Sequence, residues 1–257
     1  MVPKTQAKMN DPCSLLLWDS DFFGFRIAQV QEHTLDPGKA NEVNFWCQQN
    51  SIRCLYFLSN ADDIITTRTA EQDGYHLMDA RLTMERTLNQ EPAQNIRRDD
   101  LEICSATLKD MGSIQAIART AFYYSRFYAD PGFSRQHCND LYALWIEKSF
   151  ADPCQLVLAA RMEGQVAGFI TAGWHEQNDS SGKIGLLGVS EGMRGRGIGQ
   201  FLMDGCLAQL AQRGIKKVEA VTQMRNIGAQ RVNQRAGFIT SAVQLWYHKW
   251  FEVKAVQ

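Results

Sequence analysis

The chain has 257 residues, of which 45% are hydrophobic and 21% are charged, and its formal net charge is -1. These values are ordinary for a soluble globular protein, and so small a net charge excludes a global field that would attract nucleic acid or an anionic membrane. No window approaches about 18 consecutive apolar residues, and the polar residues 1–10 lack the pattern of a signal peptide. We therefore expect a cytoplasmic protein that binds neither nucleic acid nor membrane.

Residues 1–90 are predicted to form a small α/β domain. An apolar run at 15–18 comes first. Alternating strands and helices then follow, beginning and ending on a strand, at 25–30, 38–50, 53–58, 62–73 and 75–87. Gly74 follows the second helix at the position of a left-handed C-cap. Residues 91–100 are polar and include Pro92, so we expect a linker there.

Residues 101–257 are predicted to form the second domain. Thr107 and Asp110 begin its first helix with a capping-box pattern, and Glu163-Gly164 predicts a hairpin turn. The predicted helices are 107–122, 134–150, 195–213 and 227–235. The predicted strands are 101–104, 155–161, 165–174, 183–189, 217–222, 238–241 and 244–250.

The spacing of cysteine and histidine argues against a metal centre. The seven cysteines are odd in number and include no Cys-x-x-Cys pair, which also argues against a disulfide framework. Four of the histidines show no ligand spacing among themselves: His33, His76, His137 and His248. We expect no metal.

The loop Arg194-Gly195-Arg196-Gly197-Ile198-Gly199 is the strongest motif for ligand binding. It lies between a predicted apolar strand and an amphipathic helix. Its backbone N–H groups therefore gather at a helix N-terminus, where they lack intrahelical acceptors and suit a pyrophosphate. The glycines let the backbone approach the phosphates, and Arg194 and Arg196 can bind phosphate bidentately. The alternative is a glycine-rich turn with solvated arginines.

Two segments downstream complete a family pattern. Asn226-x-x-Ala229 is followed by Gly237-Phe238. Together with the loop, they make the sequence resemble the GCN5-related N-acetyltransferases, over roughly residues 100–250. The resemblance implies an acyl-CoA-dependent N-acyltransferase. The implied fold is α/β (α+β), with a mixed, mostly antiparallel sheet that is splayed between its fourth and fifth strands.

The resemblance also assigns roles to residues. In that family the pantetheine lies in the gap between the splayed strands and pairs with the fourth, which implies contacts from Leu187 and Val189. The N–H groups of residues 195–200, Gln200 included, would hold the pyrophosphate, and Asn226 and Ala229 would add to the acyl-CoA site. The backbone amide of Val189 would polarise the thioester carbonyl.

A second set of segments resembles members of the family that acylate nucleotide-linked amino sugars. These segments are 18–24, 125–127, 184–187 and 222–226. They imply an amino-dideoxyhexose, carried on a nucleotide such as dTDP, as acceptor in lipopolysaccharide or O-antigen biosynthesis. The acyl group is either acetyl or longer, such as 3-hydroxybutyryl. A protein N-terminus or a small amine as acceptor, or a non-catalytic acyl-CoA-binding module, are the alternatives.

The catalytic acid and base depart from the family pattern. Asn233 stands where many members carry the tyrosine that protonates the CoA thiolate, and an amide supplies no proton. His175, Tyr123, Tyr124 and Tyr247 are candidate bases, the alternative for each being a partly exposed side chain without a role. An amine of lowered pKa that loses its proton to water would need no base.

The aromatic segment 123–133 is expected to be an irregular loop over the acceptor site. Tyr124 and Tyr128 could stack on a base or sugar, and Arg126 could bind a nucleotide phosphate. The alternative is an aromatic plug between the two halves of the chain. The aromatics of 245–250 could form a homodimer contact.

Overall fold

The computed structural model describes residues 5–6, 11–88, 98–174 and 180–252. No helix in these ranges is long and apolar enough to cross a bilayer. The chain divides into two units. Unit 1 comprises residues 1–81, 126–133 and 243–257, and unit 2 comprises residues 82–125 and 134–242.

This division differs from the single linker expected at 91–100. The chain passes between the units within two long strands, β5 (His76–Thr87) and β11 (Ile239–Trp250), and again on both sides of the segment 126–133. Composition along the chain reveals a polar stretch but cannot reveal a strand shared by two units. The assignment of residues 101–257 to an acyltransferase domain stays a prediction.

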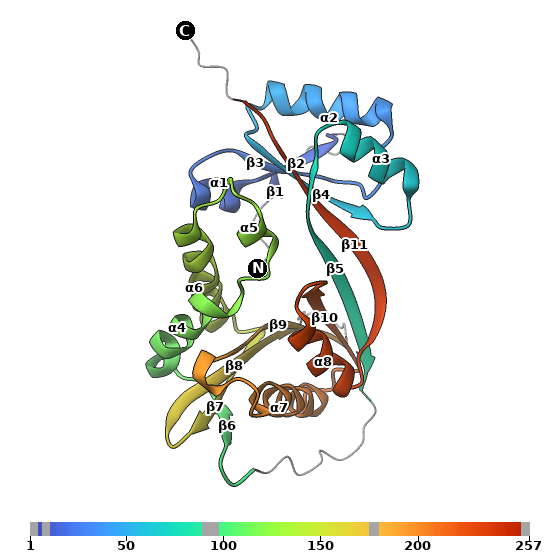
Figure 1. The fold of residues 1–257 in the computed structure, drawn as a ribbon. Helices are drawn as coiled ribbons and strands as arrows, with labels where there is room; N and C mark the ends of the chain where they lie inside the picture. The colour runs from blue at the N-terminus through green and yellow to red at the C-terminus, as the bar shows by residue number, and fades with distance from the viewer. Residues whose placement is uncertain (1–4, 7–10, 89–97, 175–179, 253–257) are drawn as a thin grey trace. The chain divides into compact units, whose positions relative to one another are not determined.

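Unit 1 is built on strands in the order β1-β2-β3-β4-β11-β5 (Figure 1). β3 runs parallel to β4, and β4 runs antiparallel to β11. The other elements of this unit are β1 (Thr5–Gln6), β2 (Cys13–Leu16), α1 (Leu17–Phe23), β3 (Ile27–Val30), α2 (Pro37–Gln49), β4 (Cys54–Asn60), α3 (Ile64–Gln72) and α5 (Arg126–Ala129).

The sheet of unit 1 is packed on both faces where β4 and β11 pair. Leu55, Phe57 and Tyr247 pack with Val43 and Cys47 of α2 on one face, and all five side chains are almost fully buried. Residues 54, 56, 246, 248 and 250 point to the other face, because successive side chains alternate along a strand. β4 is therefore buried from Cys54 to Ser59, as the apolar run at its start predicts.

Three elements of the prediction need correction. The residues after the first apolar run form the helix α1, which ends at Gly24 in a left-handed C-cap with φ 78°. The short helix α5 lies within the segment expected to be irregular. The last two predicted strands are one continuous strand, β11.

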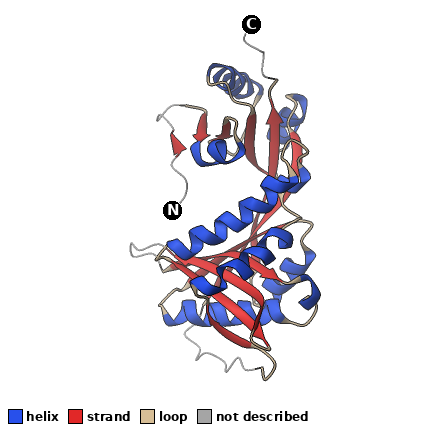
Figure 2. Cartoon of the chain, turned by 90° about the vertical axis from the view of Figure 1, so that its left-hand side faces the viewer, coloured by secondary structure: helices blue, strands red, loops and turns tan. Residues whose placement is uncertain are grey.

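Unit 2 carries strands in the order β10-β9-β8-β7-β6, between helices on both faces (Figure 2). Its elements are β6 (Glu102–Ser105), the 3₁₀ turn η1 (Leu108–Asp110), α4 (Met111–Ala121), α6 (Arg135–Ala151), β7 (Gln155–Met162), β8 (Gln165–Trp174), β9 (Ser181–Val189), the 3₁₀ turn η2 (Glu191–Met193), α7 (Ile198–Gln212), β10 (Lys217–Gln223) and α8 (Ile227–Arg235). Only the β9–β10 pairing among these strands is parallel.

Local signals in unit 2 act as predicted. Thr107 and Asp110 form the capping box, with the Thr107 N–H 2.9 Å from Asp110 Oδ2. Glu163 and Gly164 both have positive φ, the geometry of a type I′ hairpin turn. The apolar face of α7 supplies Leu202, Cys206 and Leu210 to a core shared with the strands.

Candidate active site

β9 and β10 pair over only part of their length. The ladder runs from Ser181–Lys217 to Ile184–Ala220. Beyond it β9 continues to Val189 and β10 to Gln223. The two strands therefore diverge, and the predicted splay between the fourth and fifth strands of the acyltransferase fold is confirmed.

A β-bulge in β9 lies where the divergence begins. Ile170 pairs with Leu187 but Ala172 pairs with Ile184, so β9 holds one extra residue there. The hydroxyl of the buried Thr171 accepts the Leu186 N–H at 2.8 Å, which satisfies a backbone donor that the bulge removes from the ladder. Gly185 faces the same hydroxyl, and a Cβ at this position would lie 2.4 Å from it. Only glycine fits this position without a shift of the neighbouring side chain.

The bulge sets the direction of the backbone at the end of β9. The Ser190 N–H donates to Ala167 O at 2.9 Å, so the backbone N–H of Ser190 points toward β8. In an antiparallel ladder the hydrogen-bonded pairs alternate with pairs whose N–H and C=O point away. Leu187 and Val189 therefore direct their backbone N–H and C=O groups toward the side on which β10 has diverged.

The glycine loop follows directly. Gly195 and Gly197 have φ values of 79° and 76°, in the left-handed region that disfavours a side chain. The first intrahelical bond of α7 runs from the Phe201 N–H to Gly197 O at 3.0 Å, so the amides of 198–200 have no acceptor within the helix. Gly197 also has no side chain that could cap them.

The loop is packed closely against the end of β9. A Cβ on Gly199 would lie 3.6 Å from Val232 of α8 and 3.9 Å from Val189. The Arg194 Nε donates to Val189 O at 3.3 Å. Arg194 and Arg196 are otherwise exposed, as a site for an external anion requires.

Arg98 is a loop residue that the sequence did not indicate. Its Nη1 donates to Arg196 O at 2.7 Å, and it also pairs with Asp100 through two hydrogen bonds, at 2.9 and 2.6 Å. The same Nη1 lies 3.3 Å from the position that a Cβ on Gly197 would take. The run Arg97-Arg98-Asp99-Asp100 has mixed charge and no motif, so nothing in the sequence ties it to the loop almost a hundred positions later.

The downstream family motif has a structural explanation. The Asn226 side chain accepts the Ala229 N–H at 3.1 Å, which caps α8 and accounts for the spacing Asn-x-x-Ala. Asn233 is 5% exposed, and its Nδ2 lies 3.5 Å from the sulfur of Met84. The Phe238 N–H donates to Asn233 O at 3.0 Å. Whether these residues touch acyl-CoA stays a prediction.

Tyr123 and Tyr124 lie together beside the loop. Their ring centres are 4.2 Å apart, and the Arg194 guanidinium carbon is 5.9 Å from the centre of the Tyr123 ring. The hydrogen bond with Tyr124 and partial burial raise the pKa of Tyr123 above its usual value. Tyr123 is therefore protonated at neutral pH and suits a proton donor better than a base. Of the other candidate bases, His175 lies outside the described residues and Tyr247 is buried in the core of unit 1.

The remaining predicted acceptor residues, Arg126 and Tyr128, belong to unit 1. Arg126 lies with its guanidinium carbon 4.1 Å from the ring centres of both Tyr56 and Trp246. Its Nη1 is 2.9 Å from His248 Nε2. No pattern in the sequence predicts that Arg126 lies against Tyr56, Trp246 and His248.

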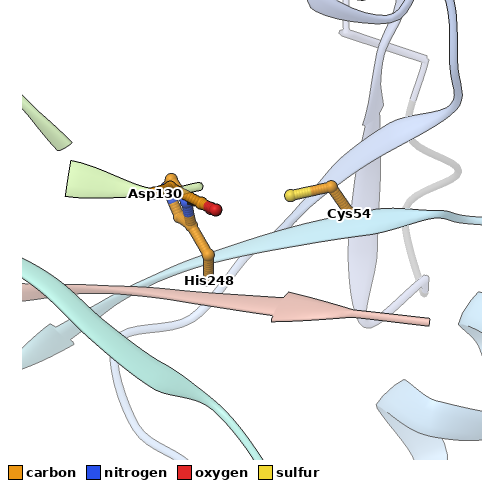
Figure 3. Close-up of side chains that lie close together, drawn as sticks. All are labelled: Cys54, Asp130 and His248. Carbon is orange, nitrogen blue, oxygen red and sulfur yellow. Dashed lines mark hydrogen bonds and ion pairs between the residues drawn. The ribbon is translucent and has the colours of Figure 1, made fainter. Parts of the chain in front are cut away.

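His248 also belongs to a buried cluster with Cys54 and Asp130, which Figure 3 shows. His248 Nδ1 is 2.6 Å from Asp130 Oδ2. Asp130 also accepts from the Gly132 N–H at 2.8 Å and from the Trp250 indole N–H at 2.9 Å. Arginine can only donate, so His248 Nε2 is the acceptor and Nδ1 carries the proton that it donates to Asp130.

These bonds leave His248 neutral and the cluster unsuited to a metal. Burial, aided by the Arg126 charge, lowers the pKa of His248 to about 4, although Asp130 opposes the shift. Burial raises the pKa of the Cys54 thiol. Both imidazole nitrogens are occupied, and a guanidinium cation lies within hydrogen-bond distance of one of them. An added metal ion would have to displace these bonds and would be repelled by the cation.

Comparison with known proteins agrees with the fold and the loop. Residues 117–238 match the acetyltransferase (GNAT) family. The structure is similar to a GCN5-related N-acetyltransferase from Sphaerobacter thermophilus, with a TM-score of 0.68, 19% identity, and coverage of 93% of this chain and 76% of the other. With the splayed strands and the glycine loop, these findings identify residues 117–238 as an acetyltransferase (GNAT) region and the chain as an acyltransferase enzyme.

Two proteins whose names state a role are similar to this chain in sequence. A dTDP-fucosamine acetyltransferase of Escherichia coli O6:H1 is 24% identical over 238 residues, which cover 91% of this chain and 96% of the relative. The spore coat polysaccharide biosynthesis protein SpsD of Bacillus subtilis is 27% identical over 141 residues, 55% of this chain. The match spans 48% of that relative's length.

Proposed function

We propose that this enzyme transfers an acyl group from acyl-CoA to the amine of a nucleotide-linked amino-dideoxyhexose. The observation that carries the proposal is the opening between β9 and β10, with uncapped amides at the start of α7 beside it. An acceptor carried on dTDP is supported by the relative named as a dTDP-fucosamine acetyltransferase, which aligns along almost its whole length. A role in surface polysaccharide biosynthesis, in the cytoplasm, follows from that proposal.

Acyl-CoA would lie along β9. The backbone groups of Leu187 and Val189, directed toward the opening, would pair with the amides of the pantetheine arm as an added strand does. The amides of 198–200 and the side chains of Arg194 and Arg196 would hold the pyrophosphate. The Val189 N–H, at the end of this ladder, would donate to the thioester carbonyl as negative charge develops on its oxygen.

The chemistry then needs little from side chains. The neutral amine attacks the thioester carbon, the C–S bond breaks, and the amine loses its extra proton to water. The CoA thiolate takes a proton in turn. Tyr123, protonated and close to Arg194, is a better donor for this step than the buried Asn233.

The test is turnover with defined acceptors. We expect the purified chain to release CoA thiol from acetyl-CoA or 3-hydroxybutyryl-CoA in the presence of dTDP-linked 4-amino-4,6-dideoxyhexoses, and mass spectrometry to find the N-acyl product. The matched control is the same nucleotide sugar with a hydroxyl in place of the amine. Turnover with small amines or peptides alone would move the acceptor to another class, and failure to bind CoA would end the proposal.

A further inference from the structure

The side chain of Arg194 lies over the end of β9, the strand along which the pantetheine arm is proposed to bind. Val189 is the last residue of this strand, and the 3₁₀ turn η2 separates it from Arg194. Within the turn the Met193 N–H donates to Ser190 O at 2.9 Å. The turn brings the chain back toward the strand, so that the Arg194 Nε donates to Val189 O at 3.3 Å.

The carbonyl that accepts this hydrogen bond is one that the ligand needs. Val189 lies opposite Gly168 of β8. The hydrogen bond toward β8 at this end of the strand is made by the next residue, Ser190. The Val189 C=O therefore points away from β8, toward the opening that β10 leaves. A pantetheine amide that adds to β9 as a strand does would donate to this carbonyl, so Arg194 and the pantetheine arm compete for one acceptor.

The contacts that hold Arg194 in this position are weak. Its side chain is exposed, and in the part of the chain that the structure describes its only side-chain hydrogen bond is the one to Val189. Its other contact is the ring of Tyr123, whose centre lies 5.9 Å from the guanidinium carbon. Neither partner carries a charge, because the raised pKa of Tyr123 keeps its phenol protonated at neutral pH. A pyrophosphate at the start of α7 would offer charge-assisted, bidentate bonds, which are stronger than a bond to a neutral carbonyl.

We propose that Arg194 is a specificity-determining residue, which favours acyl donors with a pyrophosphate over donors that carry the pantetheine arm without one. Its hydrogen bond to Val189 keeps the pantetheine site closed, and the pyrophosphate of acyl-CoA opens the site by binding the guanidinium instead. An acyl-pantetheine has no phosphate, so it must break the same hydrogen bond without compensation. This inference rests on the proposed binding of acyl-CoA along β9.

The first test is Arg194→Ala, titrated with CoA and with pantetheine, which has the same arm without the nucleotide. We expect the Kd for CoA to rise about tenfold, because one charge-assisted bond to the pyrophosphate is lost. The Kd for pantetheine should instead fall about threefold, because its binding no longer has to break a hydrogen bond. Calorimetry suits CoA, and ligand-observed NMR suits the weaker pantetheine. An unchanged or higher Kd for pantetheine would overturn the proposal.

Arg196→Ala is the matched comparison. It removes the same charge from the same exposed loop, but the Arg196 Nη1 lies 3.8 Å from the sulfur of Met162, and within the described residues its side chain makes no hydrogen bond to β9. We expect weaker CoA binding and no gain with pantetheine. A pantetheine gain of equal size in both variants would indicate a general effect of charge and would overturn the assignment to Arg194.

The second test asks whether the two parts of CoA help each other to bind. In the wild type, saturating inorganic pyrophosphate should lower the Kd for pantetheine about threefold, because it removes Arg194 from Val189. By linkage, pantetheine should strengthen pyrophosphate binding by the same factor. This coupling should disappear in Arg194→Ala. Independent binding of the two fragments to the wild type, or coupling that persists in the variant, would contradict the proposal.

None of these titrations requires an acceptor, so they separate donor selection from the proposed function. Opposite changes in CoA and pantetheine affinity, in a protein that acylates no amino sugar, would uphold donor selection and refute only the proposed acceptor. Turnover of acetyl-CoA by the wild type, with no gain for pantetheine in Arg194→Ala, would refute donor selection and leave the proposed function intact.

Discussion

The glycine loop of unit 2 and the cluster around His248 in unit 1 (Cys54, Tyr56, Arg126, Asp130 and the neighbouring tryptophans) are built in opposite ways. The loop is six consecutive residues, 194–199, whose exposed backbone makes the site. The cluster draws its side chains from three separate segments, at 54–56, 126–130 and 246–250. Four of them are buried, namely Cys54, Tyr56, Asp130 and His248. A site made of backbone can be recognised in a sequence, whereas a site made of converging side chains becomes visible only in the fold.

The same difference predicts what mutation will do in each region. Buried polar groups that satisfy one another are costly to break, because each lost partner leaves another group unpaired. In an exposed loop few buried groups would lose a hydrogen-bond partner, so changes there should alter ligand binding more than stability. The predictions below test this contrast.

The largest effect is expected from Asp130→Ala. The change removes the acceptor of three donors, the buried imidazole N–H of His248 and the partly buried N–H groups of Gly132 and Trp250. Removing one partner of a buried charged network typically costs about 3–5 kcal/mol, and we expect a loss of this size in urea unfolding. Asp140→Ala is the control, since Asp140 forms an exposed 3.5 Å ion pair with Arg119 and its loss should change stability little. A similar small loss for both variants would contradict the buried network.

A pH-dependent effect of comparable size should come from His248. Its folded pKa of about 4 lies below the ordinary value of 6.5, so between these limits the unfolded chain binds a proton that the folded chain does not. Stability should therefore fall as the pH drops from about 6.5 to about 4, by about 3 kcal/mol in total from this group. Asp130, whose folded pKa is lowered below its ordinary value of 3.8, loses its contribution only at still lower pH.

The measurement is urea unfolding at several pH values, for wild type and His248→Gln. The variant should lose the slope between pH 6.5 and 4 that belongs to His248 and keep the slope due to carboxylates. If the stability of the two proteins had the same pH dependence, the His248 imidazole would be charged in the folded state. That would contradict a neutral ring that accepts from Arg126 and donates to Asp130.

The same contrast explains which parts of the fold and of the candidate site could be predicted from the sequence. The glycine loop before α7 was predictable from local signals, because glycines between an apolar strand and a helix act through backbone geometry, whereas the splay of β9 and β10 was expected only from the family resemblance. The helix α1 was missed because only a short apolar run, at 15–18, marks this part of the sequence. In the structure the Ser20 hydroxyl donates to Leu16 O at 2.7 Å and accepts the Ile27 N–H at 2.9 Å, which connects the start of the helix to the strand that follows it.

The cluster could be predicted only in part. Arg126 was identified as a ligand-binding candidate from its aromatic neighbours in the sequence, but its actual partners, Tyr56, Trp246 and His248, come from two strands distant in the chain. His248 alternates with aromatic residues along a strand, which gave no sign of a hydrogen-bonded role. Such pairings depend on the register of β4 and β11, which a single sequence does not determine.

The smallest effect, and the sharpest test of the loop, is expected from Arg98→Ala. Arg98 holds the Arg196 carbonyl at 2.7 Å and adds a positive charge beside Gly197, so its loss should let the loop relax and weaken CoA binding about tenfold, the equivalent of about 1.4 kcal/mol. The melting temperature should hardly change, because the Arg98 side chain is only partly buried and its ion pair with Asp100 lies at the surface. Arg213→Ala removes an exposed arginine from the far end of α7 and should leave CoA affinity unchanged. Weaker binding in both variants would indicate a general effect of charge, whereas weaker binding in Arg98→Ala alone would show that an exposed loop, too, depends on one distant side chain.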